Sequence, residues 1–212
     1  MRFTSGRLEE PKDPIMCTTE TEEKSVRLDL FANPEFSRGA SWAVEFGWII
    51  LSGMLVESWV PGSRWRQALL RVFGARIGSG VVIKPRVRVK FPWRLEVGDH
   101  VWIGEGVWID NLDRVTIGSH ACISQGAYLC TGSHDWAKQS FDLITKPIQI
   151  GEGAWVAAHS VVAPGATLGE ASVLTIGSVA IGELASRTIY SGVPAQAIKK
   201  RLVQTEQTRI TV

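Results

Sequence analysis

Aliphatic side chains recur every six residues through most of the chain. Small or short β-branched side chains recur four positions after them, as in the three consecutive six-residue units of residues 117–134. This period fits neither a helix, with about 3.6 residues per turn, nor the simple alternation of a strand. It predicts a parallel β-helix, in which short strands form triangular coils that bury each other's faces. The aliphatic positions are Ile77, Ile83, Val89, Val97, Ile103, Ile109, Ile117, Ile123, Leu129, Ile150, Val156, Val162, Leu168 and Leu174.

Breaks interrupt this repeat at three places. The step between aliphatic positions rises from six to eight residues at 89–97 and again at 109–117. It rises to twenty-one at 129–150, so residues 134–147 are expected to form a loop that leaves the coil and returns. Because insertions into a repeat usually mark its binding face, we expect functional residues near the breaks.

The sequence predicts an all-β fold with an N-terminal helical pair, divided into four parts. Residues 1–37 are polar and rich in glutamate, and we expect them to be disordered or extended. Residues 38–74 should form the helices, and residues 75–184 a β-helix of about five coils with its loop at 134–147. Residues 185–212 should form a C-terminal tail.

The pattern of apolar and basic residues in the segment 41–73 predicts two short helices. The apolar run from Trp48 to Val56 is about half of the roughly 20 residues that span a bilayer. The second helix carries Arg64, Arg66 and Arg71. We expect both helices to pack on the β-helix or on a neighbouring subunit. The alternative is peripheral contact with a membrane surface through tryptophans and arginines.

The composition indicates which classes of partner and which cellular compartment to expect. A net charge of +2 over 212 residues gives no sign of a nucleic-acid partner. Cys17, Cys122 and Cys130 make no metal or disulfide pattern and fit a reducing compartment. Residues 1–30 lack the apolar run of a secretory signal. We therefore expect a cytoplasmic protein, with or without peripheral contact to the inner face of the membrane.

Four stretches resemble the hexapeptide-repeat acetyltransferases, whose coils form a left-handed β-helix. The resemblance extends over about residues 38–201 and is strongest to acetyltransferases of exopolysaccharide biosynthesis of the colanic-acid type. The maltose and galactoside O-acetyltransferases come next. The stretches are FGARIGSGVVIKPRVRVKFPWRLEVGDHVWIGEGVWIDNL (73–112), IGSHACISQGAYLCTGSHDW (117–136), KPIQIGEGAWVAAHSVVAPGATLGE (146–170) and YSGVPAQAIKK (190–200).

The resemblance implies transfer of an acetyl group from acetyl-CoA to a sugar hydroxyl, with no metal. The acceptor would belong to an exopolysaccharide or lipopolysaccharide precursor. It also implies a homotrimer whose active sites lie between subunits, in keeping with the closed symmetry of most homo-oligomers.

His134, in the segment Thr131–Trp136, is the general base that the resemblance implies. A sugar hydroxyl is too weakly acidic to attack a thioester at neutral pH. A neutral imidazole, with an unperturbed pKa of about 6.5, can take the proton as the C–O bond forms. The alternative for His134 is an exposed corner residue.

The acceptor pocket is expected at the second break and in the loop. The resemblance places Asp110 and Asn111 there, and Asp135, Trp136 and Glu105 are weaker candidates. Carboxylates and amides hydrogen-bond sugar hydroxyls and discriminate against analogues that lack them. The alternative for Asp110 and Asn111 is a side-chain cap of the turn.

The CoA contacts implied by the resemblance are Ala157, Ala158, Ile176 and, near the nucleotide phosphates, Lys199. The chain reads Ala-Ile-Gly-Glu at 180–183, where such relatives usually read Val-Thr-Lys-Asp. Loss of the Thr-Lys pair removes polar groups from the nucleotide site. Either CoA binds more weakly, or its contacts shift to Lys199 and Arg187.

Other functions are compatible with the sequence. An N-acyltransferase, a xenobiotic acetyltransferase or a non-catalytic assembly subunit could use the same fold. Carbonic anhydrases of the γ class share it and bind zinc through histidines separated by four residues. The chain has no His-x4-His pair, so we interpret His100, His120 and His159 as corner residues.

Overall fold

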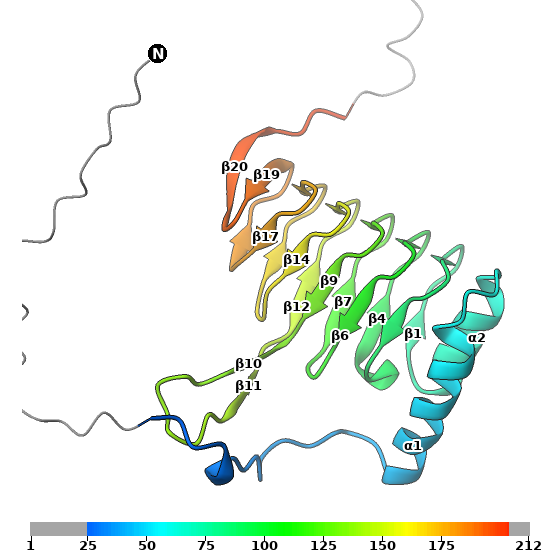
Figure 1. The fold of residues 1–212 in the computed structure, drawn as a ribbon. Helices are drawn as coiled ribbons and strands as arrows, with labels where there is room; N and C mark the ends of the chain where they lie inside the picture. Colours follow the sequence, from blue (N-terminus) through cyan, green and yellow to red (C-terminus); the bar gives the residue numbers. More distant parts are fainter. Residues whose placement is uncertain (1–24, 204–212) are drawn as a thin grey trace, which may run out of the picture.

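The computed structural model describes residues 25–203 and shows a parallel β-helix with two helices at its N-terminal end (Figure 1). The predicted fold class is therefore confirmed, including the helical pair. Residues 1–24 and 204–212, which we expected to be a disordered or extended head and the end of a tail, lie outside the described residues. Residues 25–37 are described and include the short 3-10 helix η1 (Leu28–Leu30).

Three sheets, parallel apart from the last strand of sheet B, form the sides of the prism, and each of the first five coils takes one strand from each sheet. Sheet A contains β1 (Arg76–Ile77), β4 (Leu95–Val97), β7 (Val115–Ile117), β12 (Ile148–Ile150), β15 (Thr167–Leu168) and β18 (Glu183–Leu184). Sheet B contains β2 (Val82–Ile83), β5 (Trp102–Ile103), β8 (Cys122–Ile123), β13 (Trp155–Val156), β16 (Val173–Leu174), β19 (Thr188–Gly192) and β20 (Ala195–Lys200). Sheet C contains β3 (Arg88–Val89), β6 (Trp108–Asp110), β9 (Tyr128–Cys130), β14 (Val161–Val162) and β17 (Val179–Ala180). The corners are named A–B, B–C and C–A after the sheets that they join.

The repeated aliphatic residues fill the prism. Ile103, Ile123 and Val156 occupy equivalent positions in successive strands of sheet B, and each is 1% exposed or less. The small residues Ala121 and Ala127 are equally buried. The period of six thus repeats one environment, an inward strand residue followed by a tight corner, and the burial of these side chains stabilises the stack.

The β-helix has a sixth coil beyond the five predicted, so its predicted end at residue 184 is corrected. β18 and β19 pair in parallel with β15 and β16, and β20 then folds back antiparallel to β19. The described part of the predicted tail is therefore mostly strand. The six-residue period did not predict this coil, because the buried Leu184 follows the buried Ala180 after four residues rather than six.

All three breaks in the repeat lie at the C–A corner. The first is the 3-10 helix η3 (Pro92–Arg94) between β3 and β4, and the second is a short loop between β6 and β7. The third leaves the prism as an antiparallel hairpin of β10 (Gly132–His134) and β11 (Leu143–Thr145) (Figure 1). Residues from three separate stretches are therefore stacked along one edge.

Two helices cover the first coil: α1 (Trp42–Leu51), which continues into the π-helical turn η2 (Ser52–Val56), and α2 (Arg64–Val72). Gln67 of α2 donates from Nε2 to the carbonyl of Val81 at 2.6 Å, and Leu70 is fully buried. The buried Trp48 of α1 donates its indole N–H to the carbonyl of Val89 at 3.0 Å. Both helices thus pack on the prism. No helix within residues 25–203 has the length and apolar character needed to cross a bilayer.

Candidate functional site

His134 is the last residue of β10, on the hairpin that projects from the C–A corner. Its Nδ1 lies 2.8 Å from the carbonyl oxygen of Phe141, on the returning side of the hairpin. A carbonyl oxygen only accepts hydrogen bonds, so Nδ1 carries the proton when the ring is neutral. The lone pair is then on Nε2, and His134 is arranged to take a proton at that atom.

Two phenylalanine rings contact this imidazole. The ring of Phe141 stacks on His134 with centroids 4.3 Å apart and planes inclined by 4°. The ring of Phe31 is tilted by 51° with its centroid 5.8 Å away. Phe141 also has a φ of 49°, in the left-handed region. This conformation is uncommon in a residue with a side chain, and a hydrogen bond from the N–H of Phe141 to the carbonyl of Lys138, 3.0 Å long, closes the turn there.

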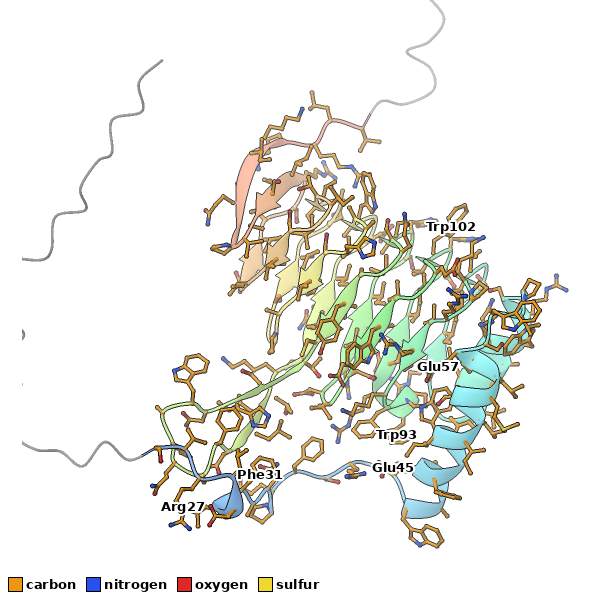
Figure 2. The ribbon with its side chains drawn as sticks, viewed as in Figure 1. Arg27, Phe31, Glu45, Glu57, Trp93 and Trp102 are labelled. Atoms are coloured by element: carbon orange, nitrogen blue, oxygen red, sulfur yellow. The ribbon has the colours of Figure 1, made fainter. Side chains whose placement is uncertain are left out.

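The N-terminal segment from Arg27 to Phe36, which contains Phe31, docks on the hairpin (Figure 2). Arg27 donates its backbone N–H to the carbonyl of Gln139 at 2.8 Å. The N–H of Leu143 donates to Oδ1 of Asn33 at 3.1 Å. We expected this part of the chain to be disordered or extended. It is instead held against the residues around the candidate base.

A cavity of about 480 Å³ lies between this segment and the hairpin. Asp135 lines the cavity, and its Oδ1 accepts the N–H of Ala137 at 3.1 Å. This carboxylate therefore caps its own loop, while the carbonyl of Phe141 orients the imidazole. Trp136 is 79% exposed at the end of the hairpin. The charged residues of the lining are Glu35, Asp135, Lys138 and Asp142.

Asp110, at the end of β6, has one carboxylate oxygen without a hydrogen bond. Its Oδ2 accepts the phenolic O–H of Tyr128 at 3.1 Å. Its Oδ1 lies 3.2 Å from Nζ of Lys90, a charge contact whose geometry does not make a hydrogen bond within the described residues. Burial raises the pKa of the Tyr128 phenol above its usual value, so that group stays a donor. Oδ1 has less than 1 Å² of exposed surface, so a sugar hydroxyl can reach it only if neighbouring side chains, such as the partly exposed Lys90, move.

Asn111 has a structural role instead. Its side chain is fully buried, with Oδ1 accepting the N–H of Phe91 at 2.9 Å and Nδ2 donating to the carbonyl of Phe91 at 2.7 Å. The amide thereby joins the first break to the second at the C–A corner. Because both ends of the amide are engaged in the core, we leave Asn111 out of the proposed acceptor site.

An aromatic stack lies next to Asp110 on sheet C. The guanidinium carbon of Arg88 is 4.4 Å from the ring centre of Trp108. Trp108 and Tyr128 stack with centroids 4.6 Å apart and planes at 26°. A cavity of about 270 Å³ separates Arg88 and Trp108 from α1, and Trp48 and Lys90 also line it. Aromatic and cationic surface thus lies beside the candidate acceptor residue.

Three of the residues predicted to contact CoA lie at or beside another corner, whereas Lys199 pairs with Ile189 on the A–B side of sheet B. Ala158 and Ile176 fall in one column along the B–C corner, where the N–H of Gly177 donates to the carbonyl of Ala158 at 3.0 Å. Ile176 is 70% exposed, whereas Ala157 is buried. Glu105 belongs to the same column and lies 3.6 Å from the guanidinium of Arg86. The structure therefore separates Glu105 from His134, whose hairpin leaves the opposite edge of sheet C.

The basic residues near the C-terminal end differ in their contacts. Lys200 donates from Nζ to the hydroxyl of Thr188 at 3.0 Å, and Arg201 donates to the carbonyl of Gly153 at 2.9 Å. Lys199, on β20, has no ion-pair partner within residues 25–203 and lines a cavity of about 310 Å³. Lys199 is thus the cation left available for a ligand.

The remaining histidines occupy corners, as the repeat predicted. His100, His120 and His159 have φ values of 55°, 60° and 55°, which the turns of the coil require. Within residues 25–203, no group of three or more His, Cys, Asp or Glu side chains is placed to hold a metal ion.

Comparison with known proteins places the chain in a family. No family model matches it. Its fold matches a hexapeptide-repeat-containing acetyltransferase of Vibrio cholerae, solved in complex with acetyl-CoA, with a TM-score of 0.70 and 26% identity over 78% of this chain and 92% of that one. It is 42% identical over 182 residues to a protein of Escherichia coli K12 that is named "putative colanic acid biosynthesis acetyltransferase WcaF". That match covers 84% of this chain and 98% of WcaF. The chain belongs to the hexapeptide-repeat acetyltransferases.

Membership of the hexapeptide-repeat acetyltransferases confirms the family resemblance and the enzyme class predicted from the repeat motifs. A more distant relative is the galactoside O-acetyltransferase of E. coli K12, 26% identical over 138 residues, which cover 64% of this chain and 68% of that protein. The sequence of this acetyltransferase did not identify Phe31 or Phe141 as residues of the site. Their roles depend on a backbone conformation inside the loop and on a contact between distant segments, and neither leaves a periodic signal.

Proposed function

We propose that this acetyltransferase moves an acetyl group from acetyl-CoA to a hydroxyl of a sugar in an exopolysaccharide or lipopolysaccharide precursor. His134 is the general base. The observation that carries the proposal is the hydrogen bond from Nδ1 of His134 to the carbonyl of Phe141, because it leaves Nε2 ready to accept the hydroxyl proton.

The reaction is a direct transfer. As Nε2 of His134 takes the hydroxyl proton, the sugar oxygen attacks the thioester carbonyl and the new C–O bond forms. The C–S bond then breaks, the proton passes from the imidazolium to the CoA sulfur, and the products are the acetylated sugar and free CoA. Backbone N–H groups stabilise the negative charge on the thioester oxygen. No acyl-enzyme is needed, because the thioester is already activated.

The acceptor side consists of Asp110 and the hairpin. Oδ1 of Asp110 accepts a hydrogen bond from a sugar hydroxyl once Lys90 has moved aside, while Tyr128 holds the carboxylate. Asp135 and Trp136 contribute from the hairpin, next to His134. An acceptor that lacks the recognised hydroxyl leaves the carboxylate oxygen unpaired, so the site discriminates against it.

The CoA side follows the B–C corner. The pantetheine arm lies along the backbone at Ala157, Ala158 and Ile176, and Lys199 meets the nucleotide phosphates. Lys199 supports this assignment because no ion pair engages it among the described residues, whereas Arg187 already lies 3.1 Å from Glu170. With Ala-Ile-Gly-Glu at 180–183, phosphate binding depends on Lys199 more than on that turn.

The active enzyme is a homotrimer with shared sites. His134 and the CoA column lie at opposite edges of sheet C, and a convex prism cannot enclose both. A second copy packed beside the first supplies the other wall, and a threefold ring closes this arrangement. We place the reaction on the cytoplasmic side of the membrane, where acetyl-CoA is available.

The test follows thioester cleavage with a thiol reagent, using acetyl-CoA and a panel of sugars and amino sugars. Release of CoA that depends on a neutral sugar hydroxyl supports the proposal. Release only with amino sugars would identify an N-acyltransferase. If no acceptor in the panel causes release of CoA, a non-catalytic assembly subunit would describe the protein better.

A further inference from the structure

Helix α1 and the turn that follows it present an apolar surface to solvent. The large hydrophobic side chains of this stretch that are at least 42% exposed form what we call the apolar face of α1. Single exposed hydrophobic residues are ordinary on protein surfaces, but a continuous set of this size marks an interaction site. These residues are Trp42, Val44, Phe46, Ile49, Ile50, Met54, Leu55, Trp59 and Val60.

The other side of the same helix fixes this face in position. Trp48, Ser52 and Val56 recur every four residues and are buried against the β-helix. Because Trp48 is also hydrogen-bonded to the carbonyl of Val89, the helix cannot roll to bury its outer side. The apolar face is therefore a permanent feature of the folded chain.

The exposed charged residues next to this face are basic. Within residues 42–60, all of which the structure describes, the acidic residues are Glu45 and Glu57, and both are partly buried. Glu45 forms an ion pair with Arg38, and Figure 2 shows Glu45 and Glu57 on the side of the helix towards the β-helix. On the adjoining α2, Arg64 and Arg71 are exposed, but the guanidinium of Arg71 donates to the carbonyls of Ile77 and Gly78 at 2.9 and 2.8 Å. The side chain of Arg64 has no hydrogen bond or ion pair among the described residues and is the charge available at this end of the molecule. An uncharged face thus lies beside positive charge, which suits an anionic surface.

The order of residues favours a bilayer over a protein. Trp42 and Trp59 stand near the two ends of the stretch and are 80% and 74% exposed, with aliphatic side chains between them. Tryptophans flanking aliphatic residues, with arginines alongside, are typical of helices that lie in the membrane interface. Specific protein interfaces carry about one hydrogen bond per 100–200 Å², and the two indoles are the only side-chain donors on this face.

We propose that the apolar face of α1 docks this protein on an anionic lipid bilayer. The helix lies in the plane of the interface, with its aliphatic residues at the level of the acyl chains and Arg64 at the headgroups. Both helices sit at one end of the prism, away from β20 (Figure 1). In the proposed trimer with parallel axes, three such faces meet the same plane, so weak contacts reinforce one another. Docking does not require the proposed reaction.

Vesicle co-sedimentation of the full chain tests this proposal. The vesicles are phosphatidylcholine alone and phosphatidylcholine mixed with phosphatidylglycerol, at low and high salt. The double variant Met54→Ser/Trp59→Ser removes two highly exposed side chains of the face, so folding should be retained, as a far-UV spectrum can verify. Ile181→Ser/Leu202→Ser is the matched control, because these residues are 62% and 90% exposed but lie far along the chain from α1.

We expect the wild type and the control to bind phosphatidylglycerol vesicles, and to bind them less at high salt. The Met54→Ser/Trp59→Ser variant should bind at least about tenfold more weakly, and Arg64→Gln about fivefold more weakly. Equal binding of the double variant and the wild type would overturn the proposal, and so would a wild type that ignores vesicles at low salt. A change in sedimentation size of the double variant without lipid would instead identify a subunit interface. Acetyl transfer to a soluble sugar, measured in parallel, keeps failure of docking distinct from failure of the proposed function.

Discussion

The hydrogen bond between Nδ1 of His134 and the carbonyl oxygen of Phe141, 2.8 Å long, joins the two sides of the hairpin and selects the free ring nitrogen. The base therefore depends on the shape of the loop as well as on its own position. Phe141 also stacks on the imidazole, and Phe31 approaches it from the N-terminal segment. The orientation of His134 thus relies on residues more than one hundred positions apart.

Replacing Phe31 by alanine should weaken the hold on the base. An aromatic contact is worth about 0.5–1.5 kcal/mol, so Phe31→Ala should lower kcat about twofold to tenfold and leave the KM for acetyl-CoA unchanged. Leu28→Ala is the control, because Leu28 lies on the same segment and is 67% exposed. Restoration of kcat by Phe31→Tyr would support a positioning role. Equal kcat values for the two alanine variants would remove Phe31 from the account.

Asp110→Asn should act on the acceptor. The amide keeps the shape of the side chain but loses the charge that Lys90 faces and that strengthens a hydrogen bond from a hydroxyl. A charge-assisted hydrogen bond contributes about 1.5 kcal/mol or more, so the KM for the sugar should rise about tenfold or more. The KM for acetyl-CoA should stay constant in the same steady-state measurements. Equal changes in both constants would mean that Asp110 does not meet the acceptor.

Asn111→Ala should lower the stability of the protein and leave the binding of both substrates unchanged. It leaves the buried N–H of Phe91 without a partner, at a cost of about 1–3 kcal/mol, while the carbonyl of Phe91 keeps its hydrogen bond from the N–H of Arg94. Thermal or urea unfolding should show this loss of stability, with both KM values unchanged below the unfolding transition. A raised KM for the sugar at wild-type stability would return Asn111 to the acceptor pocket.

The sequence predicted the fold because the repeat imposes one local environment on every coil. Ile103, Ile123 and Val156 are buried in equivalent positions for the same reason that they are periodic. The breaks marked the C–A corner, and with it His134 and Asp110. The sixth coil was missed because its spacing departs from six at Leu184.

Contacts outside the repeat could not be predicted in the same way. A buried amide and an acceptor-binding amide look alike in a sequence, so the partners of Asn111 were decided only by the packing around Phe91. The docking of Phe31 depends on a tertiary contact, and the low hydrophobicity of the head argued against order there. Handedness of the coils rested on family resemblance alone.

Mixing two inactive variants tests whether sites are shared between subunits. His134→Ala removes the base, and Ile176→Glu places a negative charge on the CoA column, where the side chain is 70% exposed. Equal amounts of the two, exchanged by mild denaturation and refolding, should recover about one quarter of the wild-type sites by random pairing in a trimer. Each variant treated alone is the control. Absence of recovery, with mixed trimers present, would place each site within one chain.

Lys199→Gln should weaken CoA binding selectively. A partly exposed charge pair is worth roughly 1 kcal/mol, so the KM for acetyl-CoA should rise about fivefold, and less at high salt. Arg187→Gln is the matched control and should have a smaller effect, because Glu170 already pairs with that arginine. A larger effect of Arg187→Gln would move the phosphate contact from Lys199 to that arginine.

The rate of the His134→Ala trimer is the strongest test of whether His134 is the base of an acetyl transfer. With acetyl-CoA and the sugar that the wild type acetylates, kcat should fall about 10²–10⁴-fold while CoA binding measured by calorimetry is retained. The profile of kcat/KM against pH should lose its acidic limb, since no imidazole is left to be protonated. A correctly folded His134→Ala trimer with wild-type kcat would show that His134 is not the base.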